Sequence, residues 1–328
     1  ISLSNLTDER MRMAKSGDWW VDNQQRALSN NSVCYTERPD MGIFMKEWLS
    51  LYESKSGERG IFNRASAQVK AAANGRRDGD IEFGTNPCCE IILRPYQFCN
   101  LSEVICRADD TIMTLKHKIK LATMLGTFQS TLTDFGYLRK RWKDTTEEER
   151  LLGVSLTGIM DCPAVYDASP EALQQLRDVA IKTNKRMAEK LGINQSTAVT
   201  CVKPSGTVSQ LVDAASGIHA RHNPYYVRTV RGDNKDPLTM FLKDKGVPSE
   251  PDFTAPDNVT VFSFPMKSPE GAICRYDMGA LEQLELWLKI ADNYCEHKPS
   301  VTISVKEHEW LEVGAWCWEH FDSLSGIS

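Results

Sequence analysis

The chain lacks the features that mark several broad classes of protein. No apolar run approaches the ~20 residues of a membrane span, and the first residues have neither the basic start nor the apolar stretch of a signal peptide. Lys and Arg number 39 against 44 Asp and Glu, so the net charge of -5 gives no basic surplus for nucleic acid. We therefore expect a cytoplasmic protein that binds neither membranes nor nucleic acids.

Cysteine is present, but not in the pattern of a disulfide framework or a redox pair. Ten cysteines in 328 residues are too dilute for a secreted disulfide scaffold, and no Cys-x-x-Cys pair occurs. We expect reduced thiols. The chain also lacks an initial Met and a closing helix cap or polar tail, so we expect a fragment of a longer polypeptide.

What is present is an ordinary globular composition, with 41% hydrophobic and 25% charged residues. Apolar residues at three- and four-residue spacing predict a helix over roughly 111–136. A second helix is bracketed by Ser169 as N-cap, Pro170 in the first turn and Gly192 as the stop.

Short segments rich in β-branched or aromatic residues predict strands between these helices. The predicted strands cover 197–202, 225–230, 258–264 and 300–305. Polar, glycine-containing stretches at 54–80 and 232–258 are expected to be surface loops. Alternating helices and strands indicate an α/β architecture, and no linker marks a domain boundary.

The segment from Gly84 to Leu93 carries the strongest chemical signal. If residues 86–90 are extended, then Asn86, Cys88 and Glu90 point to one side of the strand. An amide, a thiol and a carboxylate on one face can hydrogen-bond a polyol, remove a proton and carry out one-electron or nucleophilic chemistry at sulfur. The alternatives are thiols that fill a core and a zinc site.

That zinc site would use Cys88, Cys89, Cys99 and Cys106. The spacing argues against it, because structural zinc sites normally use ligand pairs two to four residues apart. We expect no metal ligands in this chain. His219 and His222 have no carboxylate or third histidine in a recognised pattern beside them, and we expect half-buried, hydrogen-bonded side chains.

A second segment, Cys201 to Ser209, predicts a strand that runs into a Pro-Ser-Gly-Thr turn and then a helix. Backbone donors at the start of a helix and the hydroxyls of Ser205, Thr207 and Ser209 suit a phosphate. By itself this signal is weak, because Pro-Ser-Gly-Thr is also common turn chemistry. It is not a Walker A loop, since no Gly-Lys-Ser/Thr follows the glycine at the required spacing.

The string Asn86-x-Cys88-x-Glu90, followed by Cys99-Asn100-Leu101, resembles the active-site finger loop of ribonucleotide reductases. The resemblance implies that Cys88 becomes the thiyl radical that abstracts the 3′ hydrogen and that Glu90 is the base for the 3′ hydroxyl. It also implies that Asn86 donates a hydrogen bond to the ribose and that Cys99 is one of two reducing thiols.

The loop that follows in the chain is similar to the one that holds the substrate's phosphates in this family. The resemblance therefore implies that Pro204, Ser205, Gly206, Thr207 and Ser209 contact the substrate. The longer context, including Gly217-Ile218-His219, looks most like the adenosylcobalamin-dependent branch. The fold implied is most of a ten-stranded α/β barrel with the finger loop at its centre.

The same resemblance covers essentially the whole chain, which we expect to be one partial barrel domain, 1–328. It implies that the N-terminal region and the C-terminal cysteine tail are absent, and that the partner thiol of Cys99 lies upstream of residue 1. Cys34 is the only cysteine of this chain before the finger loop, and its context favours a packed strand residue.

The resemblance further implies a ribonucleotide substrate, adenosylcobalamin as cofactor, a thioredoxin-like reductant, and nucleotide effectors that act mostly through regions outside this chain. Two alternatives remain. One is the large subunit of a reductase that receives its radical from a separate metal-containing protein. The other, of a different class, is a non-catalytic thiol-rich binding protein.

Overall fold

The computed structural model describes residues 1–327 and confirms an α/β architecture. The chain divides into two compact units, one made of Ile1–His219 and Met278–Ser328 and the other of Ala220–Asp277. Among the described residues, no helix is long and apolar enough to cross a membrane.

The first unit begins with a three-stranded parallel sheet in the order β1-β2-β3. Its strands are β1 (Ser2–Ser4), β2 (Asn31–Tyr35) and β3 (Gly60–Asn63). Helix α3 (Met41–Ser54) connects β2 to β3, as parallel pairing requires a crossover. Every residue of β2 and β3 is buried, and Cys34 packs with Phe62 and Phe83, so the prediction of a packed strand residue is confirmed.

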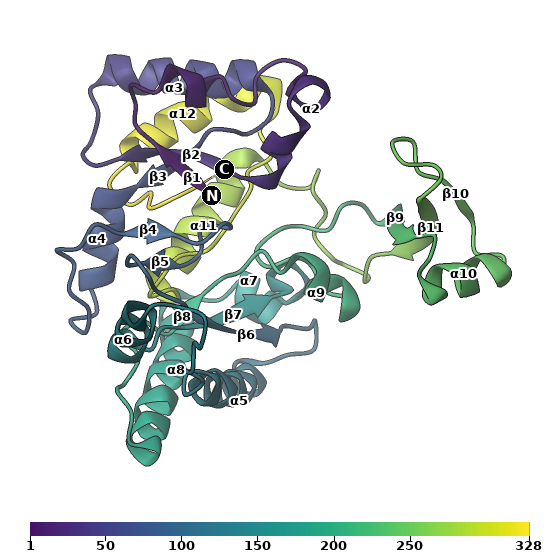
Figure 1. Cartoon of the computed structure of the whole chain (residues 1–328). Coiled ribbons are helices and arrows are strands. Elements are labelled where there is room, and N and C mark those ends of the chain that lie inside the picture. The colour runs from purple at the N-terminus through teal and green to yellow at the C-terminus, as the bar shows by residue number, and fades with distance from the viewer. Residues whose placement is uncertain (328) are drawn as a thin grey trace. The chain divides into compact units, whose positions relative to one another are not determined.

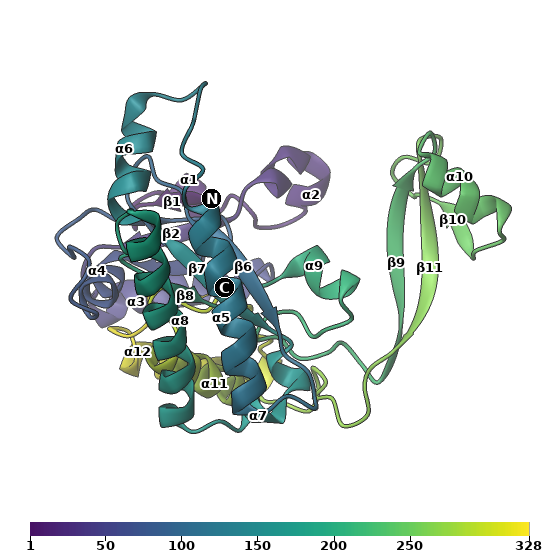
Figure 2. The ribbon, with the colours of Figure 1, turned by 90° about the horizontal axis from the view of Figure 1, so that it is seen from below.

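A second parallel sheet has the order β6-β7-β8. It consists of β6 (Asn100–Ile105), β7 (Leu152–Thr157) and β8 (Thr200–Cys201). Helix α5 (Ile112–Gln129) packs against β6 and β7 and against helix α8 (Pro170–Leu191). In the view of Figure 2 these two long helices run side by side.

Two further segments extend these sheets toward each other (Figure 1). Ile327 pairs antiparallel with Ile61 beside β3, and Pro299 pairs parallel with Val202 just beyond β8. The Lys298 ammonium group then donates to the Ser325 carbonyl at 2.9 Å, which links the two added segments. The sheets thus form one framework around the hairpin β4 (Gly84–Thr85) and β5 (Ile92–Leu93).

The remaining elements of the first unit are mostly short. They are α1 (Glu9–Arg12), α2 (Trp19–Asp22), η1 (Gln24–Leu28), α4 (Arg64–Ala72), α6 (Lys140–Glu149), η2 (Ile159–Asp161), α7 (Pro163–Tyr166), α9 (Gly206–Leu211), α11 (Ala280–Asn293), η3 (Glu307–Glu309) and α12 (Trp310–Glu319). The second unit holds β9 (Tyr225–Asp233), β10 (Ser249–Pro251), β11 (Val259–Lys267) and α10 (Pro237–Asp244). Its antiparallel sheet has the order β10-β11-β9.

The predicted helices are present, with one boundary corrected. Helix α8 starts after Ser169, whose side chain accepts the Ala172 N–H, and ends at Gly192, which has a φ of 65°. Helix α5 stops at Gln129 instead of continuing to 136. The hydroxyls of Ser130 and Thr131 donate to carbonyls three residues back at 2.7 Å each, and this competes with helix continuation.

The strand predictions are confirmed at 225–230 and 258–264, and only β8 forms within 197–202. The prediction of a strand at 300–305 is wrong, although apolar and polar residues do alternate in this segment. Side chains take over its backbone donors: Thr302 N–H binds the His219 ring at 3.0 Å, and Ser304 N–H binds Gln283 at 3.4 Å. The stretches 54–80 and 232–258 are not simple loops, because the first contains β3 and α4 and the second α10 and β10.

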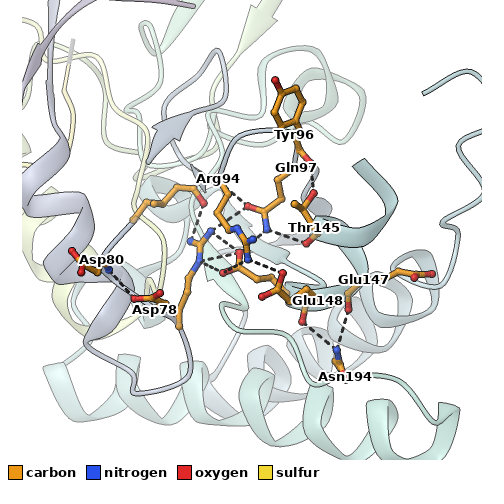
Figure 3. Close-up of polar contacts among 12 residues, drawn as sticks. Asp78, Asp80, Arg94, Tyr96, Gln97, Thr145, Glu147, Glu148 and Asn194 are labelled. Carbon is orange, nitrogen blue, oxygen red and sulfur yellow. Dashed lines mark hydrogen bonds and ion pairs between the residues drawn. The ribbon is translucent and has the colours of Figure 1, made fainter. Parts of the chain in front are cut away.

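A buried polar network holds the far end of the β4–β5 hairpin. Arg77 binds Glu149 through Nε at 3.1 Å and through Nη2 at 2.9 Å, and it donates to the Ile92 carbonyl at 2.9 Å. Gln97 bridges the pair, since it accepts from Arg77 at 3.2 Å and donates to Glu149 at 2.5 Å. Figure 3 shows the surrounding contacts, with Arg94 and Gln97 reaching toward the end of α6.

Removal of one partner of this network should destabilise the protein strongly. Arg77→Met leaves the Glu149 carboxylate buried without its cation, so we expect a loss of about 3–5 kcal/mol in the free energy of unfolding. The measurement is urea unfolding of the intact protein. The matched control is the double variant Arg77→Met/Glu149→Met, which should be more stable than Arg77→Met; an equal or larger loss would contradict the prediction.

Candidate active site

The turn between β4 and β5 places the cysteines that the sequence singled out. Residues 86–90 are not extended, so the predicted one-sided display of alternate residues is wrong. The Cys89 N–H donates to the Asn86 carbonyl at 3.0 Å, and Cys89 takes a φ of 63°, which closes a tight turn with Pro87 inside it. The Asn86 side chain also accepts the Ile91 N–H at 3.0 Å.

Neighbouring segments hold this turn from outside. The Lys298 N–H donates to the Glu90 carbonyl at 3.1 Å, and the Ile92 N–H donates to Nδ1 of His297 at 3.3 Å. Asn30 donates to the Pro87 carbonyl at 3.0 Å. Each contact satisfies a backbone group that the turn leaves without a strand partner. The finger turn, residues 86–91, is therefore fixed by side chains and by the added segment at 298–300.

Glu90 lies at the centre of the predicted site. Its side chain is 1% exposed, and neither carboxylate oxygen has a hydrogen-bond partner among residues 1–327. Its charge acts on both predicted catalytic thiols, because it raises the pKa of Cys88 and of Cys99. A buried polar group without a partner is costly and calls for a functional explanation.

Cys88 and Cys99 are each protonated. Burial raises the pKa of Cys88, Glu90 adds to the effect, and Lys203 opposes it. Burial also raises the pKa of Cys99 above its ordinary value, again with a contribution from Glu90. Both groups therefore carry their S–H hydrogens at neutral pH, which suits hydrogen-atom chemistry better than attack by a thiolate.

Cys88 opens on a cavity of about 280 Å³ that also reaches the second predicted motif. Its lining includes Cys88, Cys89, Pro204, Ser300 and Thr302. Cys99 lines a different cavity of about 490 Å³, together with Asn86 and Leu101, and Pro87 borders both cavities. The structure thus brings the finger turn together with the start of the 204–209 loop, and it places Cys99 on the other side of the turn.

The 204–209 loop follows β8 and leads into α9. Ser205 has a φ of 58° and is buried, whereas Gly206 and Thr207 are exposed. Ser209 is buried, and its hydroxyl donates to the Gly206 carbonyl at 2.8 Å. Helix α9 has N–H groups in its first turn without intrahelical partners, as every helix does. The exposed part of the loop is therefore Gly206 to Val208.

A neighbouring turn supports this loop at close range. The Ser216 hydroxyl donates to the Pro204 carbonyl at 2.6 Å. Gly217 has a φ of 59°, and a Cβ there would lie 2.4 Å from the Lys203 carbonyl oxygen, so only glycine fits. His219 is half-buried and contacts the Ser216 carbonyl at 2.8 Å, as predicted, but His222 is exposed.

Sequence reasoning missed three charged residues that the fold places near the site. Glu103 is half-buried on β6, and burial raises its pKa while nearby Ser205 and Lys203 oppose the rise. Lys203 directly precedes the loop, and its charge acts on both Cys88 and Glu103. Lys298 is fully buried and faces Cys89 and Glu90.

Two of these residues stood next to motifs already recognised, which was the available signal. Glu103 lies two residues after the motif Cys99-Asn100-Leu101. Lys203 lies in the segment Cys201 to Ser209, directly before Pro204. Among residues 1–327, no group of three or more His, Cys, Asp or Glu could hold a metal ion.

Comparisons with known proteins show which family this chain resembles. Three of the matched relatives are named adenosylcobalamin-dependent ribonucleoside-triphosphate reductase. That from Lactobacillus gasseri is 31% identical over 279 residues, 74% of this chain and 36% of the relative. That from Lactobacillus delbrueckii subsp. bulgaricus is 29% identical over 275 residues, with the same coverage, and that from Euglena gracilis is 27% identical over 286 residues, 83% and 38%.

Solved structures show the same fold. A B12-dependent (class II) ribonucleotide reductase aligns with a TM-score of 0.78 at 23% identity, covering 99% of this chain and 49% of the other. The class Id ribonucleotide reductase alpha subunit of Actinobacillus ureae aligns with a TM-score of 0.60 at 14% identity, covering 99% and 69%. No family profile matches the chain.

The chain spans little more than a third of the length of the curated relatives it matches, 36% and 38% for those above. The chain belongs to the ribonucleotide reductase family and is related to its adenosylcobalamin-dependent, class II, members.

Proposed function

We propose that this chain carries the catalytic centre of a radical ribonucleotide reductase that converts ribonucleoside triphosphates to 2′-deoxyribonucleotides. The observation that supports this most directly is the environment of Glu90. A buried carboxylate without a hydrogen-bond partner acts on two protonated thiols, Cys88 and Cys99, and Cys88 lines a cavity that also reaches Pro204. A substrate hydroxyl would supply the partner that Glu90 lacks.

In this mechanism each residue of the finger turn has a separate task. Cys88, as a thiyl radical, takes the 3′ hydrogen atom of the ribose, and Glu90 accepts the proton of the 3′ hydroxyl. Because Oδ1 of Asn86 already accepts the Ile91 N–H, the amide NH₂ group is the part that donates to the ribose. The loop from Pro204 through Ser205, Gly206, Thr207 and Ser209 receives the phosphates.

Reduction itself needs two electrons from a pair of thiols. The 2′ C–O bond breaks and the hydroxyl leaves as water with a proton from one thiol. The other thiol hydrogen goes to C2′ as the two thiols become a disulfide, and Cys88 then returns the 3′ hydrogen atom. Cys99 is one of these thiols, and it needs a second thiol as its partner. A thioredoxin-like reductant restores the dithiol. Nucleotide effectors act mostly through regions outside this chain.

Adenosylcobalamin is the cofactor named in the matched relatives, and the chemistry of Cys88 fits it. When bound, it supplies a carbon-centred radical able to take a hydrogen atom from a thiol. Cys88 meets this need because burial keeps its S–H group intact and because it opens on a cavity. Cys88 is the residue that the cofactor must approach.

The relatives favour this reading over a large subunit that receives its radical from a metal-containing partner protein. The unpartnered Glu90 argues against a non-catalytic thiol-rich binding protein, since a structural carboxylate would be paired.

Replacing Cys88 with Ser should abolish deoxynucleotide formation by the intact protein, because an alcohol O–H bond is too strong to yield the radical. The measurement is turnover of ribonucleoside triphosphate with adenosylcobalamin and a dithiol. The matched control is Cys89→Ser, the adjacent thiol, which should retain most of the activity. Measurable product from Cys88→Ser would remove Cys88 from this role.

Loss of the loop hydroxyls should weaken substrate binding. The double variant Ser205→Ala/Thr207→Ala is expected to lose about 1–3 kcal/mol of binding free energy, the scale of hydrogen bonds to a charged group. Calorimetric titration with the nucleotide measures it, and Thr207→Ser, which keeps its hydroxyl, is the control. An unchanged affinity would indicate an ordinary turn.

Cys99→Ser should separate radical formation from reduction. The variant still abstracts the 3′ hydrogen but lacks one thiol of the pair, so it stalls before product. We expect a paramagnetic signal on mixing with nucleotide and adenosylcobalamin, with little deoxynucleotide. Normal turnover would refute the reducing role, and a missing signal beside an active wild type would show that Cys99 acts earlier.

A further inference from the structure

Lys298 is a second buried charge beside the finger turn, and the mechanism above does not use it. Its side chain is 1% exposed, and its backbone connects two parts of the site. The Lys298 N–H donates to the Glu90 carbonyl at 3.1 Å, and the Lys298 carbonyl accepts the Val202 N–H at 3.2 Å. The residue is therefore fixed relative to both the finger turn and the strand that leads to Lys203.

The ammonium group is held in one place by groups that leave its charge uncompensated. Nζ donates to the Ser325 carbonyl at 2.9 Å and lies 4.8 Å from the centre of the Phe62 ring. A Cβ at Gly326 would lie 2.7 Å from Nζ, so glycine leaves the room that the ammonium group occupies. Neither contact supplies a negative charge. Among residues 1–327 the opposing groups that act on Lys298 are Cys89 and Glu90.

The other charged groups around the finger turn are paired, only half-buried or neutral. Arg77 is committed to Glu149, and Lys203 acts on Cys88 and Glu103. Burial lowers the pKa of His297 to about 3, so that ring is neutral at physiological pH.

The remaining titratable neighbours are thiols. Burial raises the pKa of Cys88, Cys99 and Cys201, and Glu90 contributes to each rise, so these groups carry no charge at neutral pH. Cys89 is half-buried beside them in the turn. Lys298 is thus the buried cation left to balance Glu90.

We infer that Lys298 is a positioning residue for the proposed reaction, whose ammonium group keeps the Glu90 carboxylate ionised and therefore able to accept the 3′-hydroxyl proton. The inference rests on the proposed function. An isolated carboxylate in a buried site takes up a proton to avoid the desolvation cost, and a fixed cation nearby opposes this. The substrate hydroxyl can then meet an ionised base instead of a neutral acid.

Lys298 carries its positive charge only over a defined pH range. Burial lowers its pKa to about 8, an effect that Cys89 and Glu90 oppose. Because a lysine is cationic below its pKa, the support for Glu90 is present below about pH 8 and is lost above it. A neutral residue at this position should therefore matter at low pH and cease to matter at high pH.

The test compares Lys298→Gln with the unchanged intact protein. Glutamine loses the charge but keeps a donor for the Ser325 carbonyl, and Lys298→Met, which loses both, reports the structural part. We expect the acid limb of the pH–kcat profile of Lys298→Gln to move up by about one pH unit, or about tenfold in rate at pH 6. KM should stay unchanged, and the two profiles should converge above about pH 9, where Lys298 has lost its proton.

Different outcomes separate the two proposals. Wild type without deoxynucleotide formation would refute the proposed function. An active wild type with an unshifted Lys298→Gln profile would overturn the role of Lys298 but leave the proposed function standing. A loss of activity in Lys298→Met alone would likewise overturn it and show instead that Lys298 is an anchor through Ser325.

A second readout does not depend on turnover. The infrared difference between wild type and Glu90→Gln isolates the carboxyl band of Glu90. An ionised band at pH 7 is expected. A protonated band in wild type would overturn the inference, and so would an identical pH course in Lys298→Gln.

Discussion

The constraint on which the site depends is the burial of a carboxylate without a hydrogen-bond partner. Glu90 sits in a six-residue connection that ordinary strand pairing cannot hold, and an unpaired buried charge favours rearrangement. The fold resists this with backbone contacts from outside the turn: the ring of His297 and the N–H of Lys298 occupy its free backbone groups. The contacts of this framework are what keep the carboxylate buried without a hydrogen-bond partner.

That framework joins segments far apart in the chain. Arg77 and Glu149 fix the outgoing strand of the hairpin, and Lys298 links the segment beside β8 to the segment beside β3. The polar groups in these links are satisfied, whereas Glu90 at their centre is not. A buried polar group that lacks a hydrogen-bond partner is a local conflict of the kind that is common at functional sites.

Much of the architecture could be predicted from local patterns. Ser169, Pro170 and Gly192 act within a few residues of their own positions, so the bounds of α8 follow from the sequence. The strand at 300–305 could not be excluded this way, because its fate depends on His219 and Gln283, which are distant in the sequence. The prediction of an extended finger loop was wrong for a related reason. Pro87 and the αL conformation of Cys89 close a turn that the alternation of residue types does not reveal.

The candidate site likewise contains residues that local sequence patterns reveal and one that only the fold reveals. Asn86, Cys88, Glu90 and Cys99 lie within fourteen consecutive positions, so their types and spacing were visible in the sequence. Lys298 lies more than two hundred positions away, and no motif connects it to the finger turn. Only the fold brings its ammonium group near the Glu90 carboxylate, neither oxygen of which has a hydrogen-bond partner among residues 1–327. A residue whose role is electrostatic leaves little trace in local sequence, because its charge acts over a distance that hydrogen-bonding motifs do not span. Such residues have to be found from burial and uncompensated charge.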